Sequence, residues 1–162
     1  MGESLSLELG DAAATEALGA ALARALAGLR DQRCLVLLEG ELGAGKTTLV
    51  RGLLRQAGHT GPVPSPTYTL VEPYEIEGTI LYHLDLYRIA DPEELEYLGW
   101  RDMTDAVALV EWPERAPELA AQADLVIRLA HADAGRRARI GSLTATGEAL
   151  EGALRQATPD FK

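Results

Sequence analysis

Lysine is almost absent from this sequence of 162 residues. Lysine and arginine together number 15, and only Lys46 and Lys162 are lysines. The Asn-Lys-x-Asp segment by which GTPases recognise guanine is therefore missing. This absence argues against a guanine-specific switch. Because lysine is so rare here, a lysine at a motif position is improbable by chance.

Cysteine, long apolar runs and an apolar leader are also lacking. Cys34 is the single cysteine, and its apolar neighbours indicate a small buried residue in a reducing compartment rather than a reactive thiol. No apolar run is long enough to cross a bilayer. Residues 1–4 show neither the basic region nor the apolar region of a secretory signal. These features predict a cytoplasmic location without membrane contact.

Positive charge is scarce as well, since the formal net charge is −10. A domain that grips a nucleic-acid backbone unaided usually shows a basic face. Here the basic residues are scattered, apart from Arg136, Arg137 and Arg139. The sequence therefore disfavours autonomous binding of nucleic acid and favours a protein partner with a basic surface.

Residues 40–47 read Gly-Glu-Leu-Gly-Ala-Gly-Lys-Thr and match the phosphate-binding P-loop pattern G-x-x-x-x-G-K-[ST]. Glycines let backbone N–H groups converge on phosphate oxygens, Lys46 adds a compact positive charge, and the Thr47 hydroxyl can bind Mg²⁺. The predicted nucleotide-binding residues are Glu41, Leu42, Gly43, Ala44, Gly45, Lys46, Thr47 and Thr48.

The surroundings of this motif fit a P-loop. Residues 34–38 form a short apolar run, typical of a buried strand. Residues 48–56 carry leucine and valine at helical spacing, and Gly58 suits the position after a helix. The pattern predicts a strand, a loop and a helix that begins near Lys46, with its positive dipole end toward the anion.

The remaining chain alternates strand and helix patterns. Asp11 and Asp91 are predicted to cap helices, and Gly99 to end the second of them. Strands are predicted at residues 5–9, 67–74, 79–84, 106–110, 125–129 and 139–145, and further helices at residues 12–27 and 147–156. We expect a single α/β P-loop NTPase domain over residues 1–157, with a frayed tail over residues 158–162. Its sheet should be mostly parallel, flanked by helices, with one antiparallel hairpin turning at residues 77–78.

Two carboxylates follow apolar strands. Asp85 follows residues 80–84, and Glu111 follows residues 106–110. In doubly wound sheets ligands lie beyond the carboxyl ends of the strands, so either acid can bind Mg²⁺ or orient water. Glu111 is the stronger candidate because five apolar residues lead into it. Asp85 could instead cap a turn.

Other polar residues near these strands leave two interpretations open. Thr67, between the P-loop helix and the next strand, is either a Mg²⁺-sensing switch residue or an ordinary turn threonine. His83 lies on the same strand face as Asp85 and either contacts phosphate or water, or is a hydrogen-bonded structural histidine. Trp112 beside Glu111 is expected to pack rather than to stack on a base.

Together these segments resemble the bacterial TsaE (YjeE) family. The resemblance rests on the P-loop, on Ser-Pro-Thr-Tyr at residues 65–68, on His-Leu-Asp-Leu-Tyr-Arg at residues 83–88, on Glu94-Leu95 with Leu98-Gly99, and on Glu-Trp-Pro-Glu at residues 111–114. It covers about residues 9–115. Glu41 and Tyr68 depart mildly from it, standing where aspartate and phenylalanine are common in the family.

This resemblance implies an ATPase that uses ATP and Mg²⁺ in the formation of N6-threonylcarbamoyladenosine at tRNA position 37. The partners would be the TsaB and TsaD proteins, which transfer the threonylcarbamoyl group and hold the tRNA. Thr47 would ligate Mg²⁺, with Glu111 as a second ligand or water-orienting group and Asp85 nearby. Thr67 would report the nucleotide state, and residues 9–15 would lie near the adenine.

Two other functions fit a P-loop. A small-molecule kinase would need an acceptor site and usually an arginine-bearing lid, and no arginine-rich insertion is visible. An ATP-dependent switch would differ only in that its hydrolysis is incidental. For the ATPase we expect weak hydrolysis that partners stimulate. Transfer of phosphate from ATP to a metabolite would instead indicate the kinase, and comparing the activity of the complex with ATP and with a non-hydrolysable analogue separates the ATPase from the switch.

Overall fold

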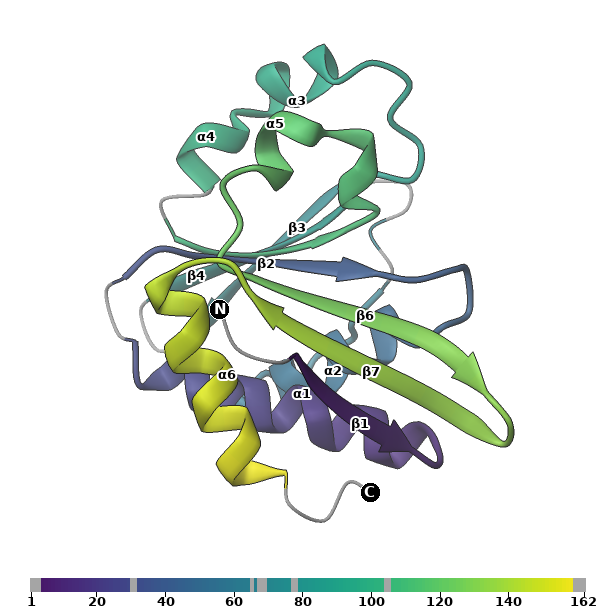
Figure 1. The fold of residues 1–162 in the computed structure, drawn as a ribbon. Helices are drawn as coiled ribbons and strands as arrows, with labels where there is room; N and C mark the ends of the chain where they lie inside the picture. The colour runs from purple at the N-terminus through teal and green to yellow at the C-terminus, as the bar shows by residue number, and fades with distance from the viewer. Residues whose placement is uncertain are drawn as a thin grey trace.

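A mixed sheet of seven strands, in the order β1-β7-β6-β2-β5-β4-β3, runs through the molecule (Figure 1). The computed structural model describes residues 4–29, 32–64, 66, 70–76, 79–103 and 106–158. The strands are β1 Leu5–Leu9, β2 Cys34–Glu39, β3 Val71–Ile76, β4 Thr79–Asp85, β5 Val107–Glu111, β6 Leu125–Ala132 and β7 Gly135–Ser142. The helices are α1 Ala12–Ala27, α2 Lys46–Gln56, α3 Glu93–Leu98, α4 Trp100–Met103, α5 Pro117–Ala120 and α6 Ala145–Ala157, with a 3₁₀ turn at Pro113–Arg115.

The centre of the sheet is parallel. Strand β2 pairs in parallel with β5 and β6, and β5 pairs in parallel with β4. Residues 34–38 of β2 are all buried, as a strand covered on both faces should be. The predicted antiparallel pairing of β3 with β4 is confirmed. The α/β class and the mixed sheet therefore agree with the sequence analysis.

The sheet also has an antiparallel hairpin, β6–β7, that the sequence analysis did not include. The strand predicted at residues 139–145 was wrong in its bounds, because β7 begins at Gly135 and ends at Ser142. Residue 145 instead begins α6, where the Thr144 side chain caps the helix by accepting from Gly147 N at 3.1 Å. The alternation of apolar and polar residues continues from β7 into the start of α6, so alternation alone did not locate the boundary between them.

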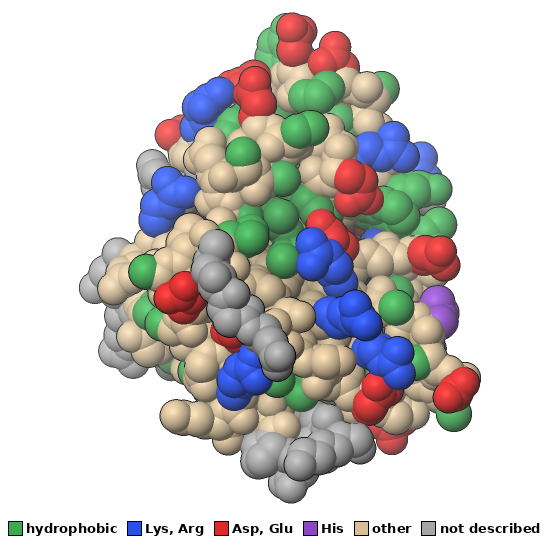
Figure 2. Space-filling model, in the orientation of Figure 1, with side chains coloured by type: hydrophobic (Ala, Val, Ile, Leu, Met, Phe, Trp, Pro, Cys, Tyr) green, Lys and Arg blue, Asp and Glu red, His purple; other side chains and the backbone are tan. Residues whose placement is uncertain are grey.

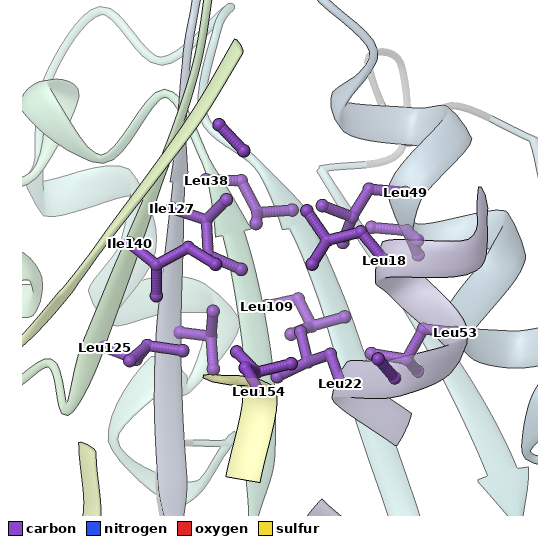
Figure 3. Close-up of a cluster of buried hydrophobic side chains, with 14 of the residues drawn as sticks. Leu18, Leu22, Leu38, Leu49, Leu53, Leu109, Leu125, Ile127, Ile140 and Leu154 are labelled. Carbon is purple, nitrogen blue, oxygen red and sulfur yellow. The ribbon is translucent and has the colours of Figure 1, made fainter. Parts of the chain in front are cut away.

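Helices cover both faces of the sheet (Figure 1). Helices α1, α2 and α6 lie on one face, and the short α3, α4 and α5 lie on the other. The first layer buries leucines from α1 and α2 against β2, β5, β6 and β7 (Figure 3). Helix α1 follows Asp11, whose side chain accepts from Ala14 N at 2.8 Å, as predicted. The apolar stripes of the helices thus match the buried face of the sheet.

Helices α1 and α2 touch through glycine. A Cβ on Gly19 would lie 2.0 Å from Leu49 O, and a Cβ on Gly52 would lie 2.1 Å from Glu16 O. Only residues without a side chain permit this distance between helix backbones. The contact holds the helix that begins at the P-loop firmly against α1.

The other sequence predictions differ by small amounts. Strand β5 begins at Val107 and includes Glu111 as its last residue. The helix after Asp91 runs over α3 and ends at Gly99, which has a φ of 72°. The three short helical turns α4, Pro113–Arg115 and α5 were not predicted, because each is too short to show a period.

Some predictions fall on residues outside the described part of the chain. These are the turn at residues 77–78, the start of the strand predicted at residues 67–74, and the tail after Thr158. Thr158 itself is buried, and its hydroxyl donates to Leu154 O at 2.5 Å. Among the described residues, no helix combines the length and apolar character needed to cross a membrane.

Candidate functional site

The P-loop joins the end of β2 to the start of α2. Gly43 and Gly45 have φ values of 80° and 107°, in the left-handed region that residues with a Cβ avoid. Gly45 is the N-cap of α2 and provides no side-chain cap. The first N–H groups of α2 are therefore left for a ligand, and the helix dipole favours an anion at this end.

Lys46 brings its charge into a largely buried position. Its side chain is 5% exposed, and Nζ donates to Gly40 O at 2.5 Å. Nζ also lies 3.8 Å from the ring centroid of Trp112. Burial lowers the pKa of Lys46, while Glu111, Asp85 and Glu114 oppose that change. The ammonium group is thus held in a poorly hydrated place where an anionic ligand would stabilise its charge.

The two predicted carboxylates lie side by side. Asp85 and Glu111 are the last residues of neighbouring parallel strands and are paired in register. Both are 3% exposed. Since parallel strands end at one edge of the sheet, residues 26 positions apart meet here.

Their hydrogen bonds differ. Thr47 Oγ1 lies 3.4 Å from Glu111 Oε2, longer than a good hydroxyl–carboxylate hydrogen bond. Asp85 Oδ1 accepts from Tyr87 N at 2.9 Å, so Asp85 also stabilises the turn after β4. Glu111 therefore approaches the P-loop through Thr47.

A cavity of about 280 Å³ opens over these groups. It is lined by Leu42, Gly43, Gly45, Lys46, Thr47, Thr48, Asp85, Glu111 and Trp112. Of the predicted phosphate-binding residues, Glu41 and Ala44 are not in this lining. Ala44 is buried beneath the loop and donates its N–H to Glu41 O at 3.0 Å. The side chain of Leu42 is 63% exposed at the cavity's edge.

The oxygen groups at this cavity fit Mg²⁺. Thr47, Asp85 and Glu111 provide a hydroxyl and two carboxylates, which are hard donors of the kind Mg²⁺ prefers. Within the described ranges, no group of three or more His, Cys, Asp and Glu side chains could bind a metal alone. Mg²⁺ usually takes one or two protein ligands, and phosphates and water complete its coordination.

Two residues at the site were not predicted to contact it. Trp112 lines the cavity in a left-handed conformation, with φ 57° and ψ 50°, and its ring lies 4.9 Å from that of Tyr87. Arg136 reaches from β7 and donates from Nη2 to Gly43 O at 3.0 Å. Sequence spacing contains no signal for a contact between positions 93 residues apart.

The predictions for Thr67 and His83 have different outcomes. Thr67 lies outside the described residues, so its position relative to the cavity stays a prediction. His83 is fully buried and bonds to Glu111. It therefore joins the site through a carboxylate rather than by lining the cavity.

Comparison with known proteins bears on this site. A family model described as threonylcarbamoyl adenosine biosynthesis protein TsaE matches residues 9–139. This chain belongs to the TsaE family. That family is a P-loop ATPase family, and membership implies nucleotide binding.

Individual TsaE relatives extend the match along the chain. The tRNA threonylcarbamoyladenosine biosynthesis protein TsaE of Haemophilus influenzae is 44% identical over 149 residues, covering 90% of this chain and 94% of the relative. The protein of the same name from Synechocystis is 44% identical over 125 residues, covering 74% and 76%. The crystal structure of Bacillus subtilis YdiB superposes with a TM-score of 0.73 at 26% identity, covering 96% and 97%. The family match includes the P-loop, both strand-end carboxylates and Arg136.

Proposed function

We propose that this chain binds ATP with Mg²⁺ and hydrolyses ATP during formation of threonylcarbamoyladenosine at position 37 of tRNA. Its membership in the TsaE family makes it a component of this tRNA modification. One observation supports hydrolysis above all: Lys46, Thr47 and two buried strand-end carboxylates meet at one cavity. Phosphoryl transfer needs these parts in one place.

Each group has a distinct task in this proposal. Backbone N–H groups of the P-loop and the Lys46 ammonium bind the β- and γ-phosphates. Thr47 would hold Mg²⁺, with Glu111 as a second ligand or as the group that orients water, and Asp85 would lie in the same shell. When bound, Mg²⁺ would neutralise phosphate charge as the terminal bond breaks. In the water-orienting role, the Glu111 carboxylate would accept a hydrogen bond from the attacking water.

The partners in this proposal are TsaD and TsaB, with tRNA held by them. The chain's net charge of −10 supports a protein partner with a basic surface. Basic side chains do gather over β6 and β7 (Figure 2). However, Arg128 and Arg137 there are paired with Glu39 and Glu8 at 2.8 and 2.7 Å. These ion pairs offset the positive charge of two of the arginines on this surface.

The first test is ATP hydrolysis by the pure protein at fixed Mg²⁺, with and without TsaB and TsaD. We expect slow hydrolysis alone, faster hydrolysis with the partners, and co-elution on a sizing column. An unchanged rate without co-elution would contradict the assignment of these partners. Replacing ATP with a non-hydrolysable analogue tests the switch alternative: tRNA modification at an undiminished rate would make hydrolysis incidental.

A further inference from the structure

His83 is the fully buried side chain that lies behind the two carboxylates. It stands on β4 two residues before Asp85, so both side chains lie on the same face of the strand. In the register of β4 and β5, His83 is opposite Leu109, and Glu111 is two residues further along. A long side chain can span this diagonal separation.

The contact between His83 and Glu111 is short. His83 Nε2 donates to Glu111 Oε2 at 2.6 Å, and both side chains are removed from water. The carboxylate can only accept, so the ring hydrogen of this bond lies on Nε2. A hydrogen bond to a charged group is strengthened where water is excluded. This bond therefore restricts Glu111 more than an exposed one would.

The two carboxylate oxygens of Glu111 have different surroundings. Oε2 accepts from His83 and lies near Thr47 Oγ1. No described residue donates to Oε1. Among the described residues, His83 thus holds Oε2 from behind, and Glu111 lines the cavity in which a ligand would meet Oε1.

The second ring nitrogen argues against a general structural role. His83 Nδ1 is buried, and no hydrogen-bond partner is found for it within the described part of the chain. Buried histidines that only support a fold usually satisfy both nitrogens. Within the described ranges, the hydrogen bond that the His83 ring makes is to Glu111.

We infer that His83 is a positioning residue for Glu111. Its Nε2–H holds the flexible glutamate in the orientation that presents Oε1 to the attacking water or to Mg²⁺. The inference rests on the proposed hydrolysis. ATP binding depends chiefly on the P-loop amides and Lys46, so loss of His83 should slow hydrolysis without weakening binding.

The experiment compares His83→Leu, which has no donor, with His83→Gln, whose amide can donate from about the position of Nε2. We measure kcat and KM for ATP with Mg²⁺ and the Kd of a non-hydrolysable ATP analogue. His83→Leu should lower kcat at least tenfold, with KM and Kd changed less than threefold. His83→Gln should recover much of the loss. His131→Leu, an exposed histidine on β6, is the matched control and should match the wild type.

A second readout needs no turnover. Unfolding of His83→Leu, Glu111→Ala and the double variant is measured by denaturant without nucleotide or metal. We expect the double variant to be clearly less destabilised than the sum of the two single variants, since they remove the same bond. Additive effects would overturn the inference.

The outcomes separate this inference from the proposed function. If the wild type hydrolyses ATP and His83→Leu keeps its kcat, His83 does not position Glu111. A raised KM with unchanged kcat would assign His83 to binding and also overturn the inference. If the wild type hydrolyses no ATP even with partners, the proposed function fails, and the unfolding experiment alone decides whether His83 and Glu111 are coupled.

Discussion

At the scale of single residues, the site concentrates charge where water is excluded. Lys46, Asp85 and Glu111 are all nearly buried around one cavity. Buried charges are costly unless they are paired, so this group is poorly explained by stability alone. A bound phosphate and its metal would complete the pairing.

Glu111→Ala tests the carboxylate at this scale. We expect kcat to fall about 100-fold or more, the range lost with a positioned base, while the Kd for ATP stays measurable. Steady-state kinetics and calorimetry give the two quantities. Glu114→Ala, an exposed carboxylate three residues away, is the control and should retain most activity. Full turnover of Glu111→Ala would remove Glu111 from the mechanism.

Cys34 offers a prediction on pH. Burial raises the pKa of this thiol from 9.0 to about 12; the Asp124 carboxylate adds to the rise, and Arg33 opposes it. The unfolded thiol releases its proton near pH 9, whereas the folded one retains it. The folded state thus binds more protons above pH 9, so this group makes the free energy of unfolding fall as pH rises from about 9 toward 12.

The measurement is urea unfolding of the wild type and Cys34→Ala at pH 8 and pH 10. The alanine variant lacks this titration, so the wild type's stability relative to it should fall by about 1 kcal/mol between the two pH values. If the stability difference between the wild type and Cys34→Ala did not change with pH, the thiol would have the same pKa in the folded and unfolded states.

At the scale of elements, the α1–α2 contact positions the P-loop helix. The backbones meet at Gly19 and Gly52, where an added Cβ would overlap a carbonyl oxygen. The two helices must therefore separate if either glycine gains a side chain. Because α2 begins at Lys46, such a shift would reach the phosphate-binding residues.

Gly19→Ala should destabilise the fold by roughly 1–3 kcal/mol, as overpacking does in a filled interior. The control is Gly152→Ala in α6, where a Cβ meets nothing within 4 Å. That exposed helical site should gain roughly 0.5–1 kcal/mol from the lower entropy of the unfolded chain. Denaturant unfolding compares the two variants. If both variants kept the wild type's free energy of unfolding, the two helices would not be in close contact at Gly19.

At the scale of the whole molecule, ligand binding and stability are linked. A ligand that binds only the folded state, at 100 times its Kd, adds about 2.7 kcal/mol to the free energy of unfolding. We expect Mg²⁺–ATP to give this stabilisation in denaturant unfolding monitored by circular dichroism. EDTA should reduce it, because the phosphates lose their counter-ion. Lys46→Ala should abolish most of it, and an equal gain in that variant would place ATP elsewhere.

The sequence by itself determined the P-loop, its strand and helix, and the two strand-end acids. These are local patterns: apolar spacing sets which face is buried, and a carboxylate after a parallel strand has one edge at which to lie. Local backbone chemistry also explains the helix cap at Asp11 and the helix end at Gly99, which were predicted. It explains the cap at Thr144 as well, which was not predicted.

Only the tertiary structure decided which side chains meet. The His83–Glu111 bond joins positions 28 residues apart, and the Arg136–Gly43 bond joins positions 93 apart. Both depend on strand order and register, which are set by the packing of the whole sheet. Strand β1 likewise pairs with β7 at the edge of the sheet, which brings residues 5–9 beside residues 136–140. The periodicity of apolar residues indicates the conformation of one segment. Which other segments pack beside it depends on the packing of the whole core.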